Sequence, residues 1–145
     1  MSTRDLKALE RHFIQEFNKG KTAAMAAIDE ICATNQIYHQ STGEDMHGLK
    51  AVKQFFDEFF DAFPDAHATL DDVIAEGDKA VIRYTFTGTH KGELMGIPAT
   101  NKKVTLSVIE IDRFAGGKIV ELWERFDTLG FMQQLGVIPK QGKEK

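Results

Sequence analysis

Hydrophobic residues recur at helical spacing in the first half of the chain. In the clearest run, apolar side chains fall at i, i+3, i+4, i+7, i+8 and i+11, and charged side chains take the opposite face. Pro64 ends this run, because the residue before a proline is disfavoured in the helical region. Two shorter runs precede it, so the pattern predicts three amphipathic helices. Their apolar positions are Leu6, Leu9, Phe13 and Phe17, then Met25, Ile28 and Ile31, then Val52, Phe55, Phe56, Phe59, Phe60 and Phe63.

From Ala68 onward the hydrophobic period changes from helical to two, which is typical of strands. Short glycine-containing breaks at Gly77-Asp78 and Ala115-Gly116-Gly117 predict two antiparallel hairpins. Residues 88–101 hold three glycines and a proline, so we expect a mobile connection there, near the mouth of a pocket. The predicted strands and the last helix span 36–40, 70–76, 80–88, 104–114, 118–126 and 129–135. Helices followed by strands indicate an α+β architecture with an antiparallel sheet curled over the helices.

Length and charge narrow the class of protein. The 145 residues fit one domain, which we place at 1–139, with a disordered tail at 140–145. A net charge of −4 argues against a nucleic-acid partner, because such binding needs a clustered basic surface. The first residues have no continuous apolar segment, so we expect no membrane partner and a cytoplasmic protein. The single cysteine, Cys32, lies among apolar residues, so we expect it to be a buried, unreactive thiol.

Asp127 is the first candidate for a functional carboxylate. It follows the end of a predicted strand beside Trp123 and Phe126, and a short apolar helix comes next. An apolar pocket floor would raise the pKa of a carboxyl in this position. Asp is also a good N-cap residue, so Asp127 has a structural interpretation as the cap of that helix, and the two roles are compatible.

Several short motifs follow one another in order between residues 4 and 139. They are Gly48-x-x-Ala51 with Phe55 and Phe59, Ala62-Phe63-Pro64-Asp65, Asp72 with Ala75-Glu76-Gly77-Asp78, Gly88-Thr89-His90-x-Gly92, Gly96-Ile97-Pro98-x-Thr100, Gly117-Lys118-Ile119, Trp123, Asp127-x-x-Gly130 and Gln134-Leu135-Gly136. In this order and spacing the chain resembles the SnoaL-like polyketide (ester) cyclase family, within the nuclear-transport-factor-2-like superfamily. The resemblance implies a cone-shaped α+β fold, in which a curved antiparallel sheet wraps around N-terminal helices and encloses an apolar pocket.

The resemblance also implies a reaction. In cyclases of this family the aspartate before the final helix is the acid/base of an intramolecular aldol ring closure that needs no cofactor and no metal, and Asp127 occupies that position. The family carries a histidine on a strand where this chain has Glu110. A second carboxylate near Asp127 would raise one pKa of the pair, so Glu110 is a further catalytic candidate if it faces the pocket.

Other polar and aromatic residues are candidates for the same pocket. His39 and His90 are candidate catalytic partners of Asp127. The alternative interpretation of each is an exposed histidine or one with a structural hydrogen bond. The expected substrate-binding residues are Tyr38, Phe55, Phe59, Arg83, Met95, Trp123 and Phe126. We expect no metal, because His47, beside Glu44 and Asp45, lacks a second ligand at i+2 or i+4.

Three functions remain open at this level. The first is a cofactor-independent lyase or isomerase acting on a hydrophobic, carbonyl-bearing small molecule. The second is a non-catalytic module that binds an apolar ligand in the same pocket. The third is an epoxide hydrolase that uses Arg83 or Arg125 with Asp127 and another acid.

We also expect a homodimer that pairs through the outer sheet face at Ile109 and Ile111, although burial of both residues within the monomer is an equal alternative.

Overall fold

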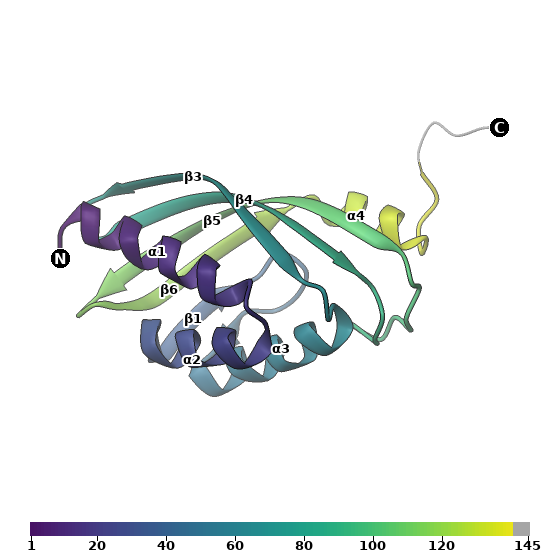
Figure 1. The fold of residues 1–145 in the computed structure, drawn as a ribbon, viewed down its shortest axis with the longest axis horizontal. Helices are drawn as coiled ribbons and strands as arrows, with labels where there is room; N and C mark the ends of the chain where they lie inside the picture. The colour runs from purple at the N-terminus through teal and green to yellow at the C-terminus, as the bar shows by residue number, and fades with distance from the viewer. Residues whose placement is uncertain (141–145) are drawn as a thin grey trace.

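The computed structural model describes residues 1–140, which form four helices and six strands (Figure 1). The predicted disordered tail, 140–145, lies outside the described residues apart from Lys140, so the domain boundary at 139 stays a prediction. The elements are α1 (Thr3–Phe17), α2 (Lys21–Ile31), β1 (Cys32–His39), β2 (Met46–His47), α3 (Leu49–Ala62), β3 (His67–Glu76), β4 (Lys79–Thr89), β5 (Lys103–Ala115), β6 (Lys118–Phe126) and α4 (Thr128–Leu135).

The six strands form one curved sheet in the order β2-β1-β6-β5-β4-β3. All neighbouring strands are antiparallel except β1 and β6, which run parallel with His39 opposite Trp123. The predicted α+β class is therefore confirmed, and the sheet is mixed rather than purely antiparallel. The parallel pair is possible because helix α3 and four strands lie between β1 and β6 in the chain, which gives the long crossover that parallel neighbours need.

The hairpin between β5 and β6 closes through Gly116 and Gly117. Both residues have positive φ angles, 58° and 78°, as the two central residues of a type I′ turn require. The turn directs the two strands back along each other, yet the pairing contains a bulge. Arg113 lies opposite Glu121 and Phe114 opposite Ile119, so Val120 has no partner and the inward face of β6 changes at this point.

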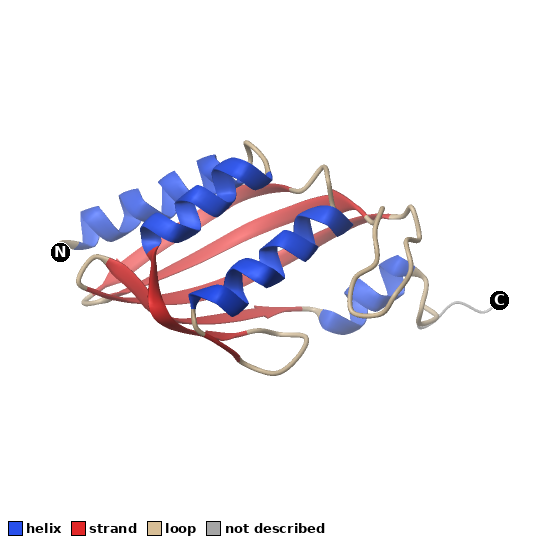
Figure 2. Cartoon of the chain, turned by 90° about the horizontal axis from the view of Figure 1, so that it is seen from below, coloured by secondary structure: helices blue, strands red, loops and turns tan. Residues whose placement is uncertain are grey.

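Helices α1, α2 and α3 lie on the concave side of the sheet (Figure 2). Helix α1 begins at a capping box, in which the Ser2 and Asp5 side chains each bond the other's backbone N–H, and it packs against β3 and β4. Its buried stripe includes Leu6, Ile14 and Phe17. Burying one such side chain contributes roughly 1.5–3 kcal/mol to stability.

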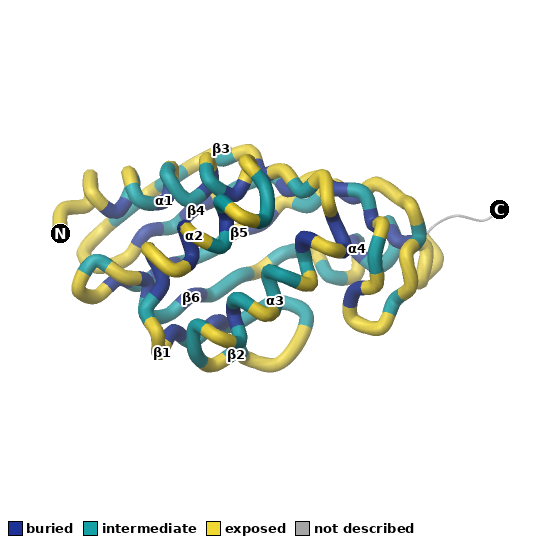
Figure 3. Tube along the Cα trace, turned by 60° about the horizontal axis from the view of Figure 1, so that its bottom comes forward, coloured by how far each residue is buried: buried dark blue, intermediate teal, exposed yellow. Residues whose placement is uncertain are grey.

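Helix α3 places its aromatic stripe toward the sheet. Val52 and Phe60 are buried, while Phe55, Phe56 and Phe59 are half-buried and face the space beneath the strands. The helix ends at Ala62 with Phe63, the residue before Pro64, as its C-cap, so it stops before the proline as the sequence predicts. Along the strands, buried segments alternate with more exposed ones (Figure 3). None of the helices formed by residues 1–140 is both long and apolar enough to cross a membrane.

Candidate active site

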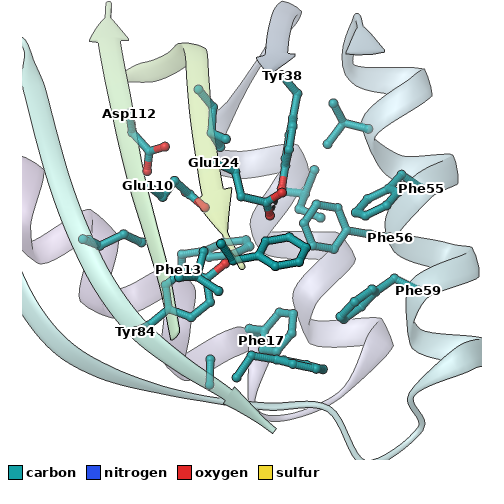
Figure 4. A pocket seen from close by; sticks show the side chains of 18 of the residues that line it. Phe13, Phe17, Tyr38, Phe55, Phe56, Phe59, Tyr84, Glu110, Asp112 and Glu124 are labelled. Atoms are coloured by element: carbon teal, nitrogen blue, oxygen red, sulfur yellow. Dashed lines mark hydrogen bonds between the residues drawn. The ribbon is translucent and has the colours of Figure 1, made fainter. Parts of the chain in front are cut away.

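A cavity of about 130 Å³ lies between the concave side of the sheet and helices α1 and α3. Its wall is mostly aromatic, which makes it suited to an apolar or flat molecule (Figure 4). The phenylalanines that line it are Phe13, Phe17, Phe55, Phe56, Phe59, Phe63, Phe86, Phe126 and Phe131.

The aromatic wall is ordered by edge-to-face packing. Phe55 and Phe56 meet with ring centroids 5.4 Å apart and planes at 83°, and the Phe59 ring packs 5.2 Å from Phe86 on β4. Tyr38 on β1 lies 6.1 Å from Phe55 and 6.5 Å from Phe56. These contacts join α3 to both halves of the sheet, so the wall is rigid.

Four carboxyl side chains interrupt the aromatic lining. Glu110 and Asp112 are two residues apart on β5 and point to the same face, and Glu124 on β6 lies directly opposite Glu110. Glu10 joins them from the buried stripe of α1. Figure 4 shows the side chains of Glu110, Asp112 and Glu124 directed toward the aromatic rings. The cavity lining formed by residues 1–140 contains no lysine, arginine or histidine.

Burial shifts the ionisation of these acids. Loss of hydration raises the pKa of Glu10 to about 7, and it raises the pKa values of Glu110 and Asp112 well above their usual range. The neighbouring Asp112 and Glu124 carboxyls raise the pKa of Glu110 further. Burial also raises the pKa of Glu124, although hydrogen bonds from Tyr38 and Ser41 oppose that change. A cluster with these shifts holds protons at neutral pH and can act as an acid or a base.

Two tyrosine hydroxyl groups accompany the acids. The Tyr38 hydroxyl donates to Glu124 Oε2 at 2.9 Å, and the Ser41 backbone N–H donates to Glu124 Oε1 at 3.3 Å. Tyr84 on β4 lines the cavity near Glu110, and burial raises its pKa well above the usual value. The Tyr84 hydroxyl therefore keeps its proton and is a hydrogen-bond donor within the cavity.

Six of the residues expected from the sequence meet at this cavity. Glu110 supplies an acid, and the others form the wall and one edge. The five that form the wall and the edge are Tyr38, Phe55, Phe59, Met95 and Phe126. Met95 reaches the cavity from the connection between β4 and β5, where it and Gly96 form a tight turn closed by two hydrogen bonds between Leu94 and Ile97. This connection lies at the cavity as expected; its mobility stays a prediction.

Asp127 lies outside the cavity lining. It is exposed and serves as the N-cap of α4, where its Oδ1 accepts a hydrogen bond from the Gly130 backbone N–H at 2.8 Å. Phe126, its neighbour in the chain, points into the cavity instead. The capping role is therefore present, and a catalytic role for Asp127 stays a prediction.

His39 and Trp123 lie side by side on the convex face of the sheet. Their rings stack with centroids 5.3 Å apart, and neither residue lines the cavity. The His39 Nε2 atom is 2.7 Å from Glu121 Oε2, and this hydrogen bond raises the pKa of His39. Arg83 is also outside the cavity and lies 3.8 Å from Asp71.

His90 is completely buried but does not line the cavity. Its Nδ1 accepts a hydrogen bond from the Thr100 backbone N–H at 3.2 Å, and its ring packs against Phe63. Burial lowers the pKa of His90, so the ring is neutral at neutral pH. This arrangement ties the two ends of the 90–102 connection together.

Sequence reasoning missed Glu10, Asp112, Glu124 and Tyr84. Two of them carry a signal in the sequence: Glu10 falls on the apolar stripe of the first helix, and Asp112 continues the alternation that includes Val108. Glu124 has no such signal. Counting alternate residues from Ile119 puts Trp123 inside, whereas the bulge at Val120 turns Glu124 inward.

The chain belongs to the SnoaL-like polyketide cyclase family, whose family model matches residues 8–135. Among solved structures, AclR from Streptomyces galilaeus, a proposed hydroxylase, is 26% identical with a TM-score of 0.81, over 95% of this chain and 100% of that one. TsrD from Streptomyces laurentii is 28% identical with a TM-score of 0.82, over 95% and 99%. A proposed polyketide cyclase from Bacillus cereus is 30% identical with a TM-score of 0.69, over 88% and 80%. No curated protein matches the sequence.

Proposed function

We propose that this protein is a cofactor-independent lyase or isomerase of the aldol-cyclase kind, acting on a hydrophobic, carbonyl-bearing small molecule with Glu110 as general acid/base. The observation that carries the proposal is the placement of buried carboxyl groups inside an aromatic cavity. Membership of the SnoaL-like polyketide cyclase family supports the reaction class. The cavity supports the substrate class, because its wall is apolar and its polar groups are gathered around Glu110 and Glu124.

The chemistry follows from the groups that face the cavity. Ionised Glu110 removes a proton from a carbon between two carbonyl groups, and the C–H electron pair becomes that of an enolate. The Tyr84 hydroxyl donates a hydrogen bond to the enolate oxygen. The enolate carbon attacks an aldehyde or ketone within the same molecule, and protonated Glu110 returns its proton to the new alkoxide.

The environment of Glu110 suits it to this reaction. An ordinary carboxylate, with a pKa of about 4, is a weak base toward a carbon acid. Burial and the adjacent acids raise the pKa of Glu110, so its ionised form is a stronger base and its protonated form persists at neutral pH. Asp127 is exposed at the start of α4, so it has neither the burial nor the neighbouring acids that surround Glu110.

The test compares two isosteric variants with aromatic β-dicarbonyl compounds as candidate substrates. Glu110→Gln is expected to lower turnover by about 10²–10⁴, the usual size of a general acid–base effect. Asp127→Asn is expected to keep turnover, because Asn can cap α4 as Asp does. Circular dichroism of both variants controls for folding. Loss of turnover in folded Asp127→Asn with activity kept in Glu110→Gln would move the base to Asp127.

A binding module is the second candidate, favoured by the continuous aromatic lining of the cavity. It would show saturable binding of an apolar ligand that emerges chemically unchanged, in wild type and in Glu110→Gln alike. Epoxide hydrolysis has less support, because Arg83 and Arg125 both lie outside the cavity lining. Incorporation of oxygen-18 from water into a diol product would establish it.

We further propose that the protein is a homodimer that pairs through the convex face of the sheet. Ile109 on β5 and Ile74 on β3 are 51% and 57% exposed, which is unusual for large apolar strand residues. Ile111 is half-buried on the same strand as Ile109. A partner on this face would remove these side chains from water without closing the cavity on the other side.

A further inference from the structure

Three of the acids that line the cavity form a group that we call the carboxyl chain: Glu110, Asp112 and Glu10. Asp112 has no exposed surface and Glu10 is 2% exposed. Asp112 follows Glu110 on the same face of β5 and lines the same cavity as Glu10, and both neighbours act on its ionisation, so it joins the two ends of the group. Figure 4 shows Glu110 and Asp112 following each other along β5 toward the cavity.

The carboxyl chain lacks ordinary hydrogen-bond donors. Within residues 1–140, no N–H or hydroxyl group donates to either carboxyl oxygen of Asp112 or to Oε2 of Glu10. Buried oxygens without a donor are costly, and fully ionised acids packed this closely would repel one another. Protons on the neighbouring carboxyls would supply donors, so the folded protein favours a carboxyl chain that holds protons.

The groups around the carboxyl chain do not replace those protons. Glu124 faces Glu110 from β6, and Tyr84 faces it from β4, but neither carries a positive charge. Cys32 and Gln36 line the cavity from β1; burial raises the pKa of Cys32 to about 12, so it stays neutral. Among residues 1–140, no three acids, histidines or cysteines are arranged to hold a metal ion.

We propose that Glu10 and Asp112 are positioning residues that share protons with Glu110 and thereby switch it between acid and base. The proposal rests on the proposed function, because it assigns the source of the ionised Glu110. With two protons on three carboxyls, the Glu110 proton passes to Asp112 while the Asp112 proton passes to Glu10. Glu110 becomes the anion, Glu10 becomes neutral, and the total charge of the chain stays −1.

The test is a titration of the full-length protein by carboxyl carbon NMR with labelled Glu and Asp. In wild type, the Glu110 carboxyl signal is expected to respond to a titration step near pH 7, although that step is centred on Glu10. Glu10→Gln is expected to move the Glu110 response upward by at least one pH unit, since the group that ionises most readily is gone. Asp112→Asn is expected to abolish the Glu110 response near pH 7 while Glu10 still titrates, because the amide has no acidic proton to share and so uncouples Glu110 from Glu10.

The matched control is Glu16→Gln, on the same helix but outside the cavity, where Glu16 pairs with Lys19. It should leave every signal of the carboxyl chain unchanged. A Glu110 titration that is the same in wild type, Glu10→Gln and Asp112→Asn would overturn the proposal. The titration needs no substrate, so this failure is distinct from failure of the proposed function, which turnover measures. Once a substrate is found, the pH profile of turnover should move with the Glu110 signal in Glu10→Gln.

Discussion

At the scale of single residues, carboxyl groups with the same chemistry behave differently because of where the backbone holds them. Glu10 and Asp112 are enclosed by apolar side chains and keep protons at pH values where an exposed acid is ionised. Asp127 is in water and accepts a backbone hydrogen bond at a helix start. The first environment favours proton transfer, and the second favours stability of α4.

The capping role of Asp127 predicts a small and specific loss of stability. Asp127→Ala removes the acceptor for the Gly130 N–H and should lower the free energy of unfolding by about 1 kcal/mol. Asp127→Asn is the matched control and should be nearly neutral, because Asn is an equally good cap. Urea unfolding measures both. Equal stability of Asp127→Ala and wild type would mean that the hydrogen bond of 2.8 Å contributes nothing.

The burial of Glu10 predicts how stability depends on pH. Its pKa is about 7 in the folded protein against 4.5 for an ordinary Glu, so the folded state holds the proton more tightly. The stabilisation that this proton gives the folded state is fully present below pH 4.5, and it is lost as the pH rises to about 7. At about 1.4 kcal/mol for each pKa unit, the loss is on the order of 3 kcal/mol.

Glu10→Gln should remove the contribution of Glu10 to this dependence, since Gln does not titrate, whereas Glu110 and Asp112, whose pKa values are also raised, still contribute theirs. Urea unfolding at pH 5 and pH 8 should therefore show a smaller difference in Glu10→Gln than in wild type, with Glu16→Gln behaving like wild type. His39, whose pKa is also raised, contributes equally to all three proteins and cancels in the comparison. Parallel pH dependence in Glu10→Gln and wild type would show that Glu10 does not hold its proton in the folded state.

At the scale of elements, the connection between β4 and β5 is held as a closed loop beside the cavity. The His90 backbone N–H donates to Lys102 at 2.9 Å, and the Asn101 N–H donates back to His90 at 2.8 Å. The Lys91 N–H donates to the Ala62 carbonyl at the end of α3, also at 2.8 Å. These bonds fix the position from which Met95 reaches the cavity.

Gly92 makes this docking possible and gives the prediction at this scale. A Cβ atom at Gly92 would lie 2.7 Å from the backbone oxygen of Asp61, which cannot rotate away. Gly92→Ala should cost about 1–3 kcal/mol, typical of overpacking, and should weaken binding of a cavity ligand by displacing Met95. The control is Gly43→Ala, whose Cβ would meet only the flexible Gln40 side chain. Equal unfolding free energies for the two variants would contradict the prediction.

At the scale of the whole molecule, the curved sheet separates two surfaces with different uses. Its concave side and helices α1–α3 enclose the cavity, whereas its convex side leaves Ile109 and Ile74 in water. Among residues 1–140 no further element covers the convex side, because α4 lies at the end of the sheet beside β5 (Figure 1). In the proposed dimer, a second copy of the chain would cover that face.

The proposed dimer predicts a mass of twice 16.3 kDa in light scattering after size-exclusion chromatography. Ile109→Lys should shift the protein to the monomer mass, because a charge at the centre of the paired faces would be buried without a partner. Leu129→Lys is the control, since Leu129 is equally exposed, at 51%, but lies on α4. A wild-type protein with the monomer mass would reject the dimer.

Local periodicity made much of the fold predictable. The phenylalanine stripe of α3, the stop at Pro64 and the hairpin turn at Gly116 and Gly117 each follow from interactions within a few residues, so their structure is set by the neighbouring sequence. The same applies to α1, whose stripe already contains Glu10. The parallel pairing of β1 with β6 is a long-range contact, and no local pattern specifies it.

The site depended on contacts that are distant in the sequence. By itself the sequence determined the α+β class, the aromatic wall from Phe55 and Phe59, and Glu110 as a candidate acid. Only the tertiary structure decided that Glu10 and Asp112 line the same cavity, because helix docking brings them together, and that Glu124 rather than Trp123 faces inward. The reason is that strand faces alternate with every residue, so the unpaired Val120 reverses which side chains of β6 meet the cavity.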